Sequence, residues 1–100
     1  MTELRELQVR LLLSIQRALL GEVTPNIRAV TAAIDESTIT LRWIIDGEIT
    51  DDFRIDLSAV GAEIVADFKS HQIAEEFLRC DAPRLIRDLY LDHIAYVRKE

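Results

Sequence analysis

A chain of 100 residues, of which 49% are hydrophobic, is long enough to bury a core of its own, and 18 acidic against 12 basic residues give a net charge of -6. This charge excludes nucleic acid and anionic membrane surfaces as main ligands, because both are bound chiefly through cationic side chains. Cys80 is the only cysteine, and no segment reaches the roughly eighteen consecutive apolar residues of a membrane span. We therefore expect residues 1–100 to form a single cytoplasmic domain without disulfides.

The first twenty residues predict an amphipathic helix that ends at Gly21. Its apolar side chains recur at helical spacing, at Leu4, Leu7, Leu11, Ile15 and Leu19. Leu12, Leu13 and Leu20 widen the apolar stripe beyond one narrow face. A second contact surface, for a partner or a second copy of the chain, is therefore expected on this helix.

Two strands are predicted to follow, over residues 27–34 and 38–45. The second strand alternates strictly and places Ile39, Leu41, Trp43 and Ile45 on one face. A tight turn at residues 35–37 joins the two strands into an antiparallel hairpin. Its apolar face is expected to lie on the core, so a core role is favoured for Trp43 over a role as a binding anchor.

A second amphipathic helix is predicted from about residue 51 to Phe68, since apolar residues recur there at helical intervals. Thr50 or Asp51 is expected to cap its N-terminus. Gly61 costs roughly 1 kcal/mol relative to alanine inside a helix. We therefore expect Gly61 to mark close packing against the first helix or the sheet.

Residues 72–80 predict a third strand, and its Ile73, Glu75, Phe77 and Arg79 face is only half apolar, which is typical of an edge strand. Residues 84–91 are open between a short helix and a loop. Residues 93–98 predict a last strand. The order α-β-β-α-β-β, with two hairpins each preceded by a helix, indicates an α+β two-layer sandwich: a four-stranded, mainly antiparallel sheet with two helices on one face.

The sequence contains no constellation typical of an enzyme or a cofactor site. His71 and His93 lack the spacing of a zinc site, and three glycines do not form a phosphate-binding loop. The acidic run after Ile45 differs from a calcium loop, because Gly47 comes too early and no glutamate closes the pattern. We expect no catalysis, no metal and no cofactor; a small enzyme would need a cleft that gathers residues such as His93 and Asp81.

Five acidic residues crowd residues 46–56, which we call the acidic segment, with Arg54 as the only cation: Asp46, Glu48, Asp51, Asp52 and Asp56. A turn followed by helix-cap charges explains part of this cluster. The other interpretation is a surface that binds a basic partner. Glu75 and Glu76 form a second candidate patch, and Tyr90 and Tyr96 are weaker candidates for anchors.

Three segments resemble a family of small bacterial proteins: residues 16–30 (QRALLGEVTPNIRAV), residues 46–49 (DGEI) and residues 64–68 (IVADF). The resemblance covers about residues 11–80 and the end of the chain from Tyr96 to Glu100, and residues 84–93 match no part of it. It implies a helix, a hairpin, a second helix and a closing pair of strands. Some members of this family are immunity proteins for toxins of contact-dependent growth inhibition and related systems.

Charge and resemblance together indicate a non-catalytic binding protein that neutralises a basic toxin, such as a nuclease, with the acidic segment as the contact surface. The alternative is a cytoplasmic structural or regulatory module that forms a homodimer through the first helix or an open sheet edge. The two hypotheses differ in their response to salt, because screening weakens an electrostatic contact and leaves an apolar one largely unchanged.

Overall fold

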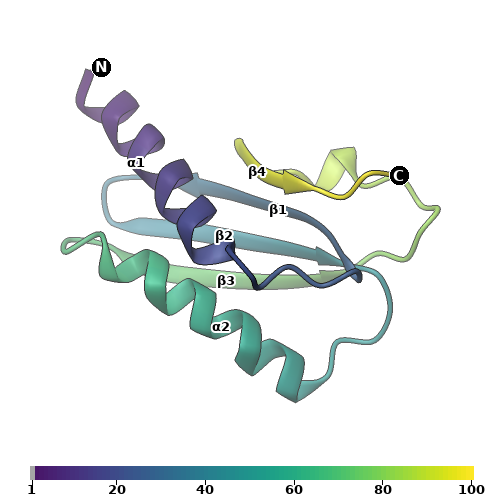
Figure 1. Cartoon of the computed structure of the whole chain (residues 1–100). Helices are drawn as coiled ribbons and strands as arrows, with labels where there is room; N and C mark the ends of the chain where they lie inside the picture. The colour runs from purple at the N-terminus through teal and green to yellow at the C-terminus, as the bar shows by residue number, and fades with distance from the viewer. Residues whose placement is uncertain (1) are drawn as a thin grey trace.

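The computed structural model describes residues 2–100, and Figure 1 shows how its helices and strands are arranged. The elements in chain order are α1 (Thr2–Leu19), β1 (Ile27–Ile34), β2 (Thr38–Ile45), α2 (Asp51–Ala66), β3 (Gln72–Arg79), the short 3-10 helix η1 (Arg87–Leu89) and β4 (His93–Val97). The predicted order and the α+β class are confirmed. Gly21 follows α1 with φ +77°, a left-handed conformation that ends the helix.

The four strands form one mixed sheet in the order β3-β2-β1-β4. β1 pairs antiparallel with both β2 and β4, whereas β2 and β3 are parallel. The predicted hairpin of the first two strands is confirmed, and so is the edge position of the third. The predicted second hairpin is wrong, because β3 and β4 lie at opposite edges of the sheet. α2 connects the end of β2 to the start of β3 and returns the chain to the end of the sheet where β2 begins. The two neighbouring strands therefore run in the same direction.

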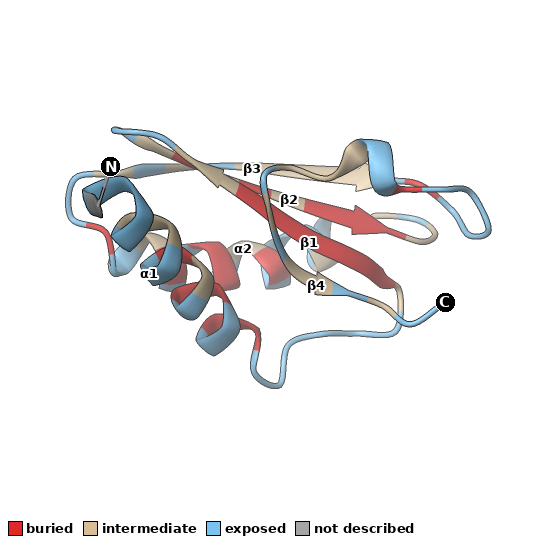
Figure 2. Ribbon diagram, turned by 90° about the horizontal axis from the view of Figure 1, so that it is seen from above, coloured by how far each residue is buried: buried red, intermediate tan, exposed pale blue. Residues whose placement is uncertain are grey.

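Both helices lie on one face of the sheet, as predicted, and the two central strands are its most buried part (Figure 2). α1 contacts α2, β1 and β4, while α2 contacts β3. Trp43 is completely buried in the core that the helices and the sheet share. Within residues 2–100, no helix has the length and apolar character needed to cross a membrane.

The connection from β3 to β4 crosses the opposite face of the sheet. Ile86 packs there against Ala29 and Ile44. The Leu91 backbone N–H donates a hydrogen bond to Thr31 Oγ1 at 3.1 Å, which ties the connection to β1. The choice left open for residues 84–91 is thus resolved as a loop with a single 3-10 turn at Arg87–Leu89.

A bulge in β1 sets the direction of Arg28. Ile27 pairs with Ile45, but Ala29 pairs with Ile44, so Arg28 is the extra residue. Only 1% of Arg28 is exposed, although it is an arginine in a central strand. A buried guanidinium needs acceptors, and the residues that supply them lie at the end of the sheet next to the acidic segment.

Candidate partner-binding surface

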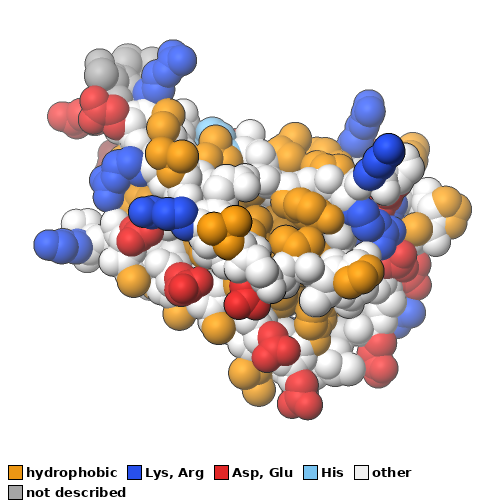
Figure 3. All heavy atoms as spheres, in the orientation of Figure 1, with side chains coloured by type: hydrophobic (Ala, Val, Ile, Leu, Met, Phe, Trp, Pro, Cys, Tyr) orange, Lys and Arg blue, Asp and Glu red, His pale blue; other side chains and the backbone are white. Residues whose placement is uncertain are grey.

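The acidic segment continues from the end of β2 into the first turns of α2. Thr50 caps the helix, since its hydroxyl accepts a hydrogen bond from the Phe53 N–H at 3.1 Å. Asp51 and Asp52 lie in the first turn, where the helix dipole stabilises negative charge. Figure 3 shows acidic side chains over α2 and the loop that precedes it. Four of the five acidic residues of the segment are exposed, namely Glu48, Asp51, Asp52 and Asp56.

Asp46, the fifth acid of the segment, is engaged inside the protein. Its carboxylate forms an ion pair with Arg98 at 3.2 Å, and its N–H donates to the Asn26 carbonyl at 2.8 Å. Arg98 also donates to the Pro25 carbonyl at 2.7 Å. The structure thus places Asp46 in a contact between the end of β2, the start of β1 and the C-terminal residues.

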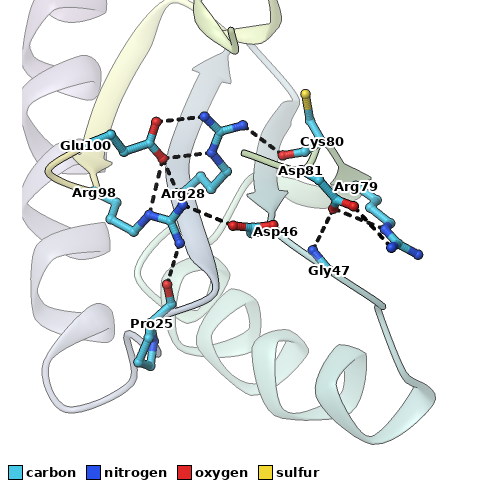
Figure 4. A network of polar contacts seen from close by, with 9 residues as sticks. All are labelled: Pro25, Arg28, Asp46, Gly47, Arg79, Cys80, Asp81, Arg98 and Glu100. Atoms are coloured by element: carbon cyan, nitrogen blue, oxygen red, sulfur yellow. Dashed lines mark hydrogen bonds and ion pairs between the residues drawn. The ribbon is translucent and has the colours of Figure 1, made fainter. Parts of the chain in front are cut away.

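The same contact extends to Arg28 and Glu100 (Figure 4). Arg28 donates two hydrogen bonds of 2.7 Å, from Nε and Nη2, to the two carboxylate oxygens of Glu100, and a third of 2.8 Å to the Cys80 carbonyl. The hydrogen bonds from Arg28 lower the pKa of Glu100 to about 2, and Arg98 adds to the effect. Sequence analysis missed this network; the one signal for it was an arginine inside an otherwise apolar strand.

Asp81 joins the loop after β3 to the loop after β2. Its carboxylate accepts a hydrogen bond from the Gly47 N–H at 2.7 Å and pairs with Arg79 at 3.1 Å. Gly47 has φ +91°, a left-handed conformation that glycine adopts readily. The hydrogen bond from Arg79, followed by that from Gly47, lowers the pKa of Asp81. The two loops are therefore fixed beside one another at one end of the sheet.

Glu75 and Glu76 lie on opposite faces of β3, so they do not form one patch. Neighbouring residues of a strand alternate between faces, and here Glu75 lies under α2 while Glu76 pairs with Arg42 at 2.7 Å on the other side. A Cβ atom on Gly61 would lie 2.7 Å from Glu75 Cδ. Gly61 thus marks close packing of α2 on the sheet, one of the two alternatives predicted for it.

The aromatic candidates and the histidines are dispersed. Trp43 belongs to the core, as predicted, and Tyr90 and Tyr96 are half-buried against the two faces of the sheet. His71 Nε2 lies 2.9 Å from the Asp35 carbonyl oxygen at a strand end. His93 pairs with Ala32 inside the sheet, whereas Asp81 follows the far end of β3. The structure does not bring His93 and Asp81 together in a cleft.

The leucines predicted to form a second surface on α1 are exposed to different degrees. Leu13 is 59% and Leu20 is 78% exposed, while Leu12 is half-buried. Leu13 and Leu20 border a shallow groove of about 580 Å³ that Phe68 and Asp67 close from the side of α2. Arg10, Gln16 and Arg17 also line this groove, so its surface is partly apolar and partly charged.

The exposed carboxylates are suited to holding cationic groups of another molecule. They lie on a helix start and a loop that the Thr50 cap and the Gly47–Asp81 hydrogen bond fix in place. Arg54, the cation among them, lies over the Phe77 ring with its guanidinium carbon 5.3 Å from the ring centroid. A fixed cluster of like charges attracts an oppositely charged partner over a distance of about one Debye length, roughly 10 Å.

Comparison with known proteins connects the chain to a protein family. The family model described as MafI2 immunity protein matches residues 8–100, which include most of α1, the whole of α2, all four strands and the C-terminal network. The search of curated proteins found no match. Because the matched region covers nearly the whole chain, the protein belongs to the MafI2 immunity protein family.

Proposed function

We propose that this immunity protein neutralises a basic toxin by binding it through Glu48, Asp51, Asp52 and Asp56. The family supports an immunity role against a toxin. The observation that supports this surface is the gathering of four exposed carboxylates on one fixed helix start and its preceding loop. Asp46 and Glu76 form ion pairs within the protein and Glu75 is partly buried under α2, so the proposed surface does not include these three residues.

The proposed mechanism is occlusion of the toxin in the cytoplasm, without catalysis. A toxin that cleaves nucleic acid needs cationic side chains to bind phosphates, and an acidic protein surface competes for these side chains. Electrostatic attraction also raises the rate of encounter, which matters for an inhibitor that has to act before the toxin does. A nuclease is therefore the class of toxin that this surface fits best.

A pull-down from the source cells tests this proposal. The tagged parent protein is compared with a variant in which Glu48, Asp51, Asp52 and Asp56 are changed to the corresponding amides. We expect the parent to recover a basic toxin polypeptide and the variant to lose it. Expression of the recovered toxin in a host cell then shows whether the parent, and not the variant, protects growth.

A second variant with the same change in net charge serves as the matched control. It carries amides at four exposed acids elsewhere on the molecule, namely Glu3, Glu6, Glu36 and Asp92. The control variant is expected to recover the toxin as the parent does. Equal loss in both variants would show that net charge, and not this surface, governs binding, and an undiminished recovery by the first variant would refute the proposed surface.

Self-association through α1 is the second candidate function, and the exposure of Leu13 and Leu20 beside a groove favours it. Sedimentation of the purified protein over a range of concentrations measures it directly. A dimer that is insensitive to salt and is lost in the Leu13→Ser, Leu20→Ser double variant would support this function. A monomer at all concentrations would exclude it.

A further inference from the structure

A groove lies between the first half of α2 and the segment that connects α1 to β1. It has a volume of about 430 Å³, which falls within the roughly 300–1,000 Å³ of ligand-binding clefts in proteins. Glu22 and Thr24 line it from the connecting segment, and five residues from Phe53 to Ala59 line it from the helix. The groove shares Asp56 with the acidic segment, so the two features are neighbours on α2.

The side of the groove that belongs to α2 is mostly apolar. Leu57 is part of the core and Phe53 packs against the core, so the protein interior holds both side chains in place. Ile55 is a large apolar residue of the same wall and is 68% exposed. Covering such a side chain with an apolar group of another molecule is favourable by about 25 cal/mol for each Å² buried. The groove thus offers apolar contacts beside the exposed carboxylates.

The charged residues that line the groove in the described part of the chain are two carboxylates. Glu22 belongs to the connecting segment and Asp56 to α2, and both residues are exposed. Within residues 2–100, neither carboxylate forms an ion pair. Arg54, the cation of the acidic segment, lies over the Phe77 ring and does not line the groove. The groove therefore has a negative potential that a cation of another molecule can neutralise.

Hydrogen bonds hold the connecting segment that forms the second wall. The Glu22 N–H donates to the Leu19 carbonyl at 2.9 Å at the end of α1, and the Ile27 N–H donates to the Thr24 carbonyl at 3.1 Å at the start of β1. The Thr24 hydroxyl also donates a hydrogen bond to the Asn26 side chain. A wall that is ordered in advance loses less conformational entropy when a partner binds, so this segment is preorganised for a contact.

We propose that the groove receives one arginine or lysine side chain of the toxin. This inference rests on the proposed function. The aliphatic stem of the toxin residue lies against Phe53 and Ile55, and its cationic head donates hydrogen bonds to the carboxylates of Glu22 and Asp56. Long cationic side chains suit such a groove, because they bury their methylene groups on apolar surface and keep the charge beside acceptors. An apolar side chain in the same place would leave both carboxylates without a partner.

Removal of the Glu22 carboxylate tests the charged part of the groove, because Glu22 lies outside the four carboxylates of the proposed surface. Kd is measured with the toxin polypeptide that the parent protein recovers in the pull-down, immobilised in an inactivated form. We expect Glu22→Gln to raise Kd by about tenfold, the loss typical of a hydrogen bond between charged groups. Glu36→Gln removes the charge of another exposed glutamate and should keep Kd within about twofold of the parent value. Equal Kd values for these two variants would overturn the proposal.

Filling the groove tests its apolar part without a change of charge. Ala59 lines the groove, so Ala59→Leu places a larger side chain where the stem of the toxin residue would lie. We expect Kd to rise by about tenfold or more, since the stem then lacks space. Ala62→Leu is the matched control, because Ala62 is exposed on the same helix and does not line the groove. Its Kd should stay within about twofold of the parent value, and thermal unfolding of each variant checks that the fold is retained.

Variants of the toxin identify the occupant of the groove. When each arginine and lysine of the toxin is changed to alanine in turn, one variant should bind the parent and Glu22→Gln with the same Kd, because the partner of the carboxylate is already absent. If no toxin variant behaved in this way, or if Ala59→Leu raised Kd while Glu22→Gln did not, the occupant would not be a cation. Failure of the proposed function has a different signature, because the parent protein itself would then bind no toxin.

Discussion

The surroundings of the Glu75 carboxyl disfavour its charged form. The residue faces α2 from the edge strand β3, and its Oε2 atom is buried without a hydrogen-bond partner, as is the Trp43 Nε1 atom. Desolvation raises the pKa of the Glu75 carboxyl, and polar groups of Ser58 and Trp43 oppose part of this shift. A charge that points inward on an edge strand discourages pairing with other chains, which gives this unfavourable group a structural purpose.

The raised pKa of Glu75 predicts a stability that depends on pH. The folded protein holds this proton to a higher pH than the unfolded chain does, so the site is most stable below the ordinary pKa of 4.5 and loses stability as pH rises through the raised value. Glu75→Gln should therefore raise the free energy of unfolding near neutral pH, because the amide has nearly the same shape and carries no charge for burial to disfavour. Urea unfolding at a series of pH values measures the difference.

The difference between Glu75→Gln and the parent should shrink below pH 4.5, where the carboxyl is protonated in both states. Glu63→Gln, which changes an exposed glutamate on α2, is the control and should leave stability unaltered at every pH. If Glu75→Gln were less stable than the parent near neutral pH, the carboxylate would be a favourable contact and this account of Glu75 would be wrong.

At the scale of the elements, local signals predicted the helices and strands well, because each rests on neighbouring residues. The alternation in β2 and the Thr50 cap of α2 are of this kind. Strand pairing is different, since the residues of β3 do not specify which strand they join. The length of the connection over residues 80–92 was the available signal against a second hairpin, whose loops have mostly two to five residues.

The part of the candidate surface that lies within one local element could be predicted from the sequence, whereas its contacts with distant residues could not. Glu48, Asp51 and Asp52 follow from a turn and a helix start that the sequence marks clearly. The ion pair of Asp46 with Arg98 joins residues that are 52 positions apart, and nothing in either local sequence indicates the other. Glu75 and Glu76 are a different case, because strand alternation alone places them on opposite faces.

The contact of Arg28 with Glu100 joins the bulge of β1 to the residues after β4, and we predict that it depends on the guanidinium. Arg28→Lys keeps the charge but loses the two parallel hydrogen bonds to the carboxylate and the third bond to the Cys80 carbonyl. The free energy of unfolding should fall by about 2 kcal/mol, the loss typical of hydrogen bonds to a charged group. Urea unfolding measures it, and Arg17→Lys at an exposed pair with Asp67 is the control.

The pH dependence of the same contact has the opposite sign to that of Glu75. Because the pKa of Glu100 is lowered to about 2, its contribution to stability is complete above the ordinary value of 4.5 and is lost as pH falls through the lowered value. Glu100→Gln should lack this loss. If the free energy of unfolding changed with pH in the same way for the parent and for Glu100→Gln over this range, the pair of Arg28 and Glu100 would not stabilise the fold.

At the scale of the whole molecule, the exposed acids of the acidic segment gather at one end of the sheet. The protein measures 38 × 26 × 20 Å, and the start of α2 lies at the end of the sheet where β2 ends. The exposed leucines of α1 lie on the helix layer. One end is therefore suited to electrostatic recognition, whereas the groove beside α1 combines apolar residues (Leu13, Leu20 and Phe68) with charged ones (Arg10, Arg17 and Asp67).

The gathering of exposed acids at the start of α2 predicts how salt affects toxin binding. Between about 0.05 M and 0.5 M salt, the association rate constant of the parent with the toxin should fall by about tenfold or more, because screening removes the long-range attraction. The variant with amides at Glu48, Asp51, Asp52 and Asp56 should lose most of this dependence. The control with amides at Glu3, Glu6, Glu36 and Asp92 has the same net charge and should keep it. Stopped-flow measurements on the three proteins give the dependence of the association rate constant on salt concentration. An equal dependence for the two variants would mean that the toxin responds to total charge and not to the start of α2.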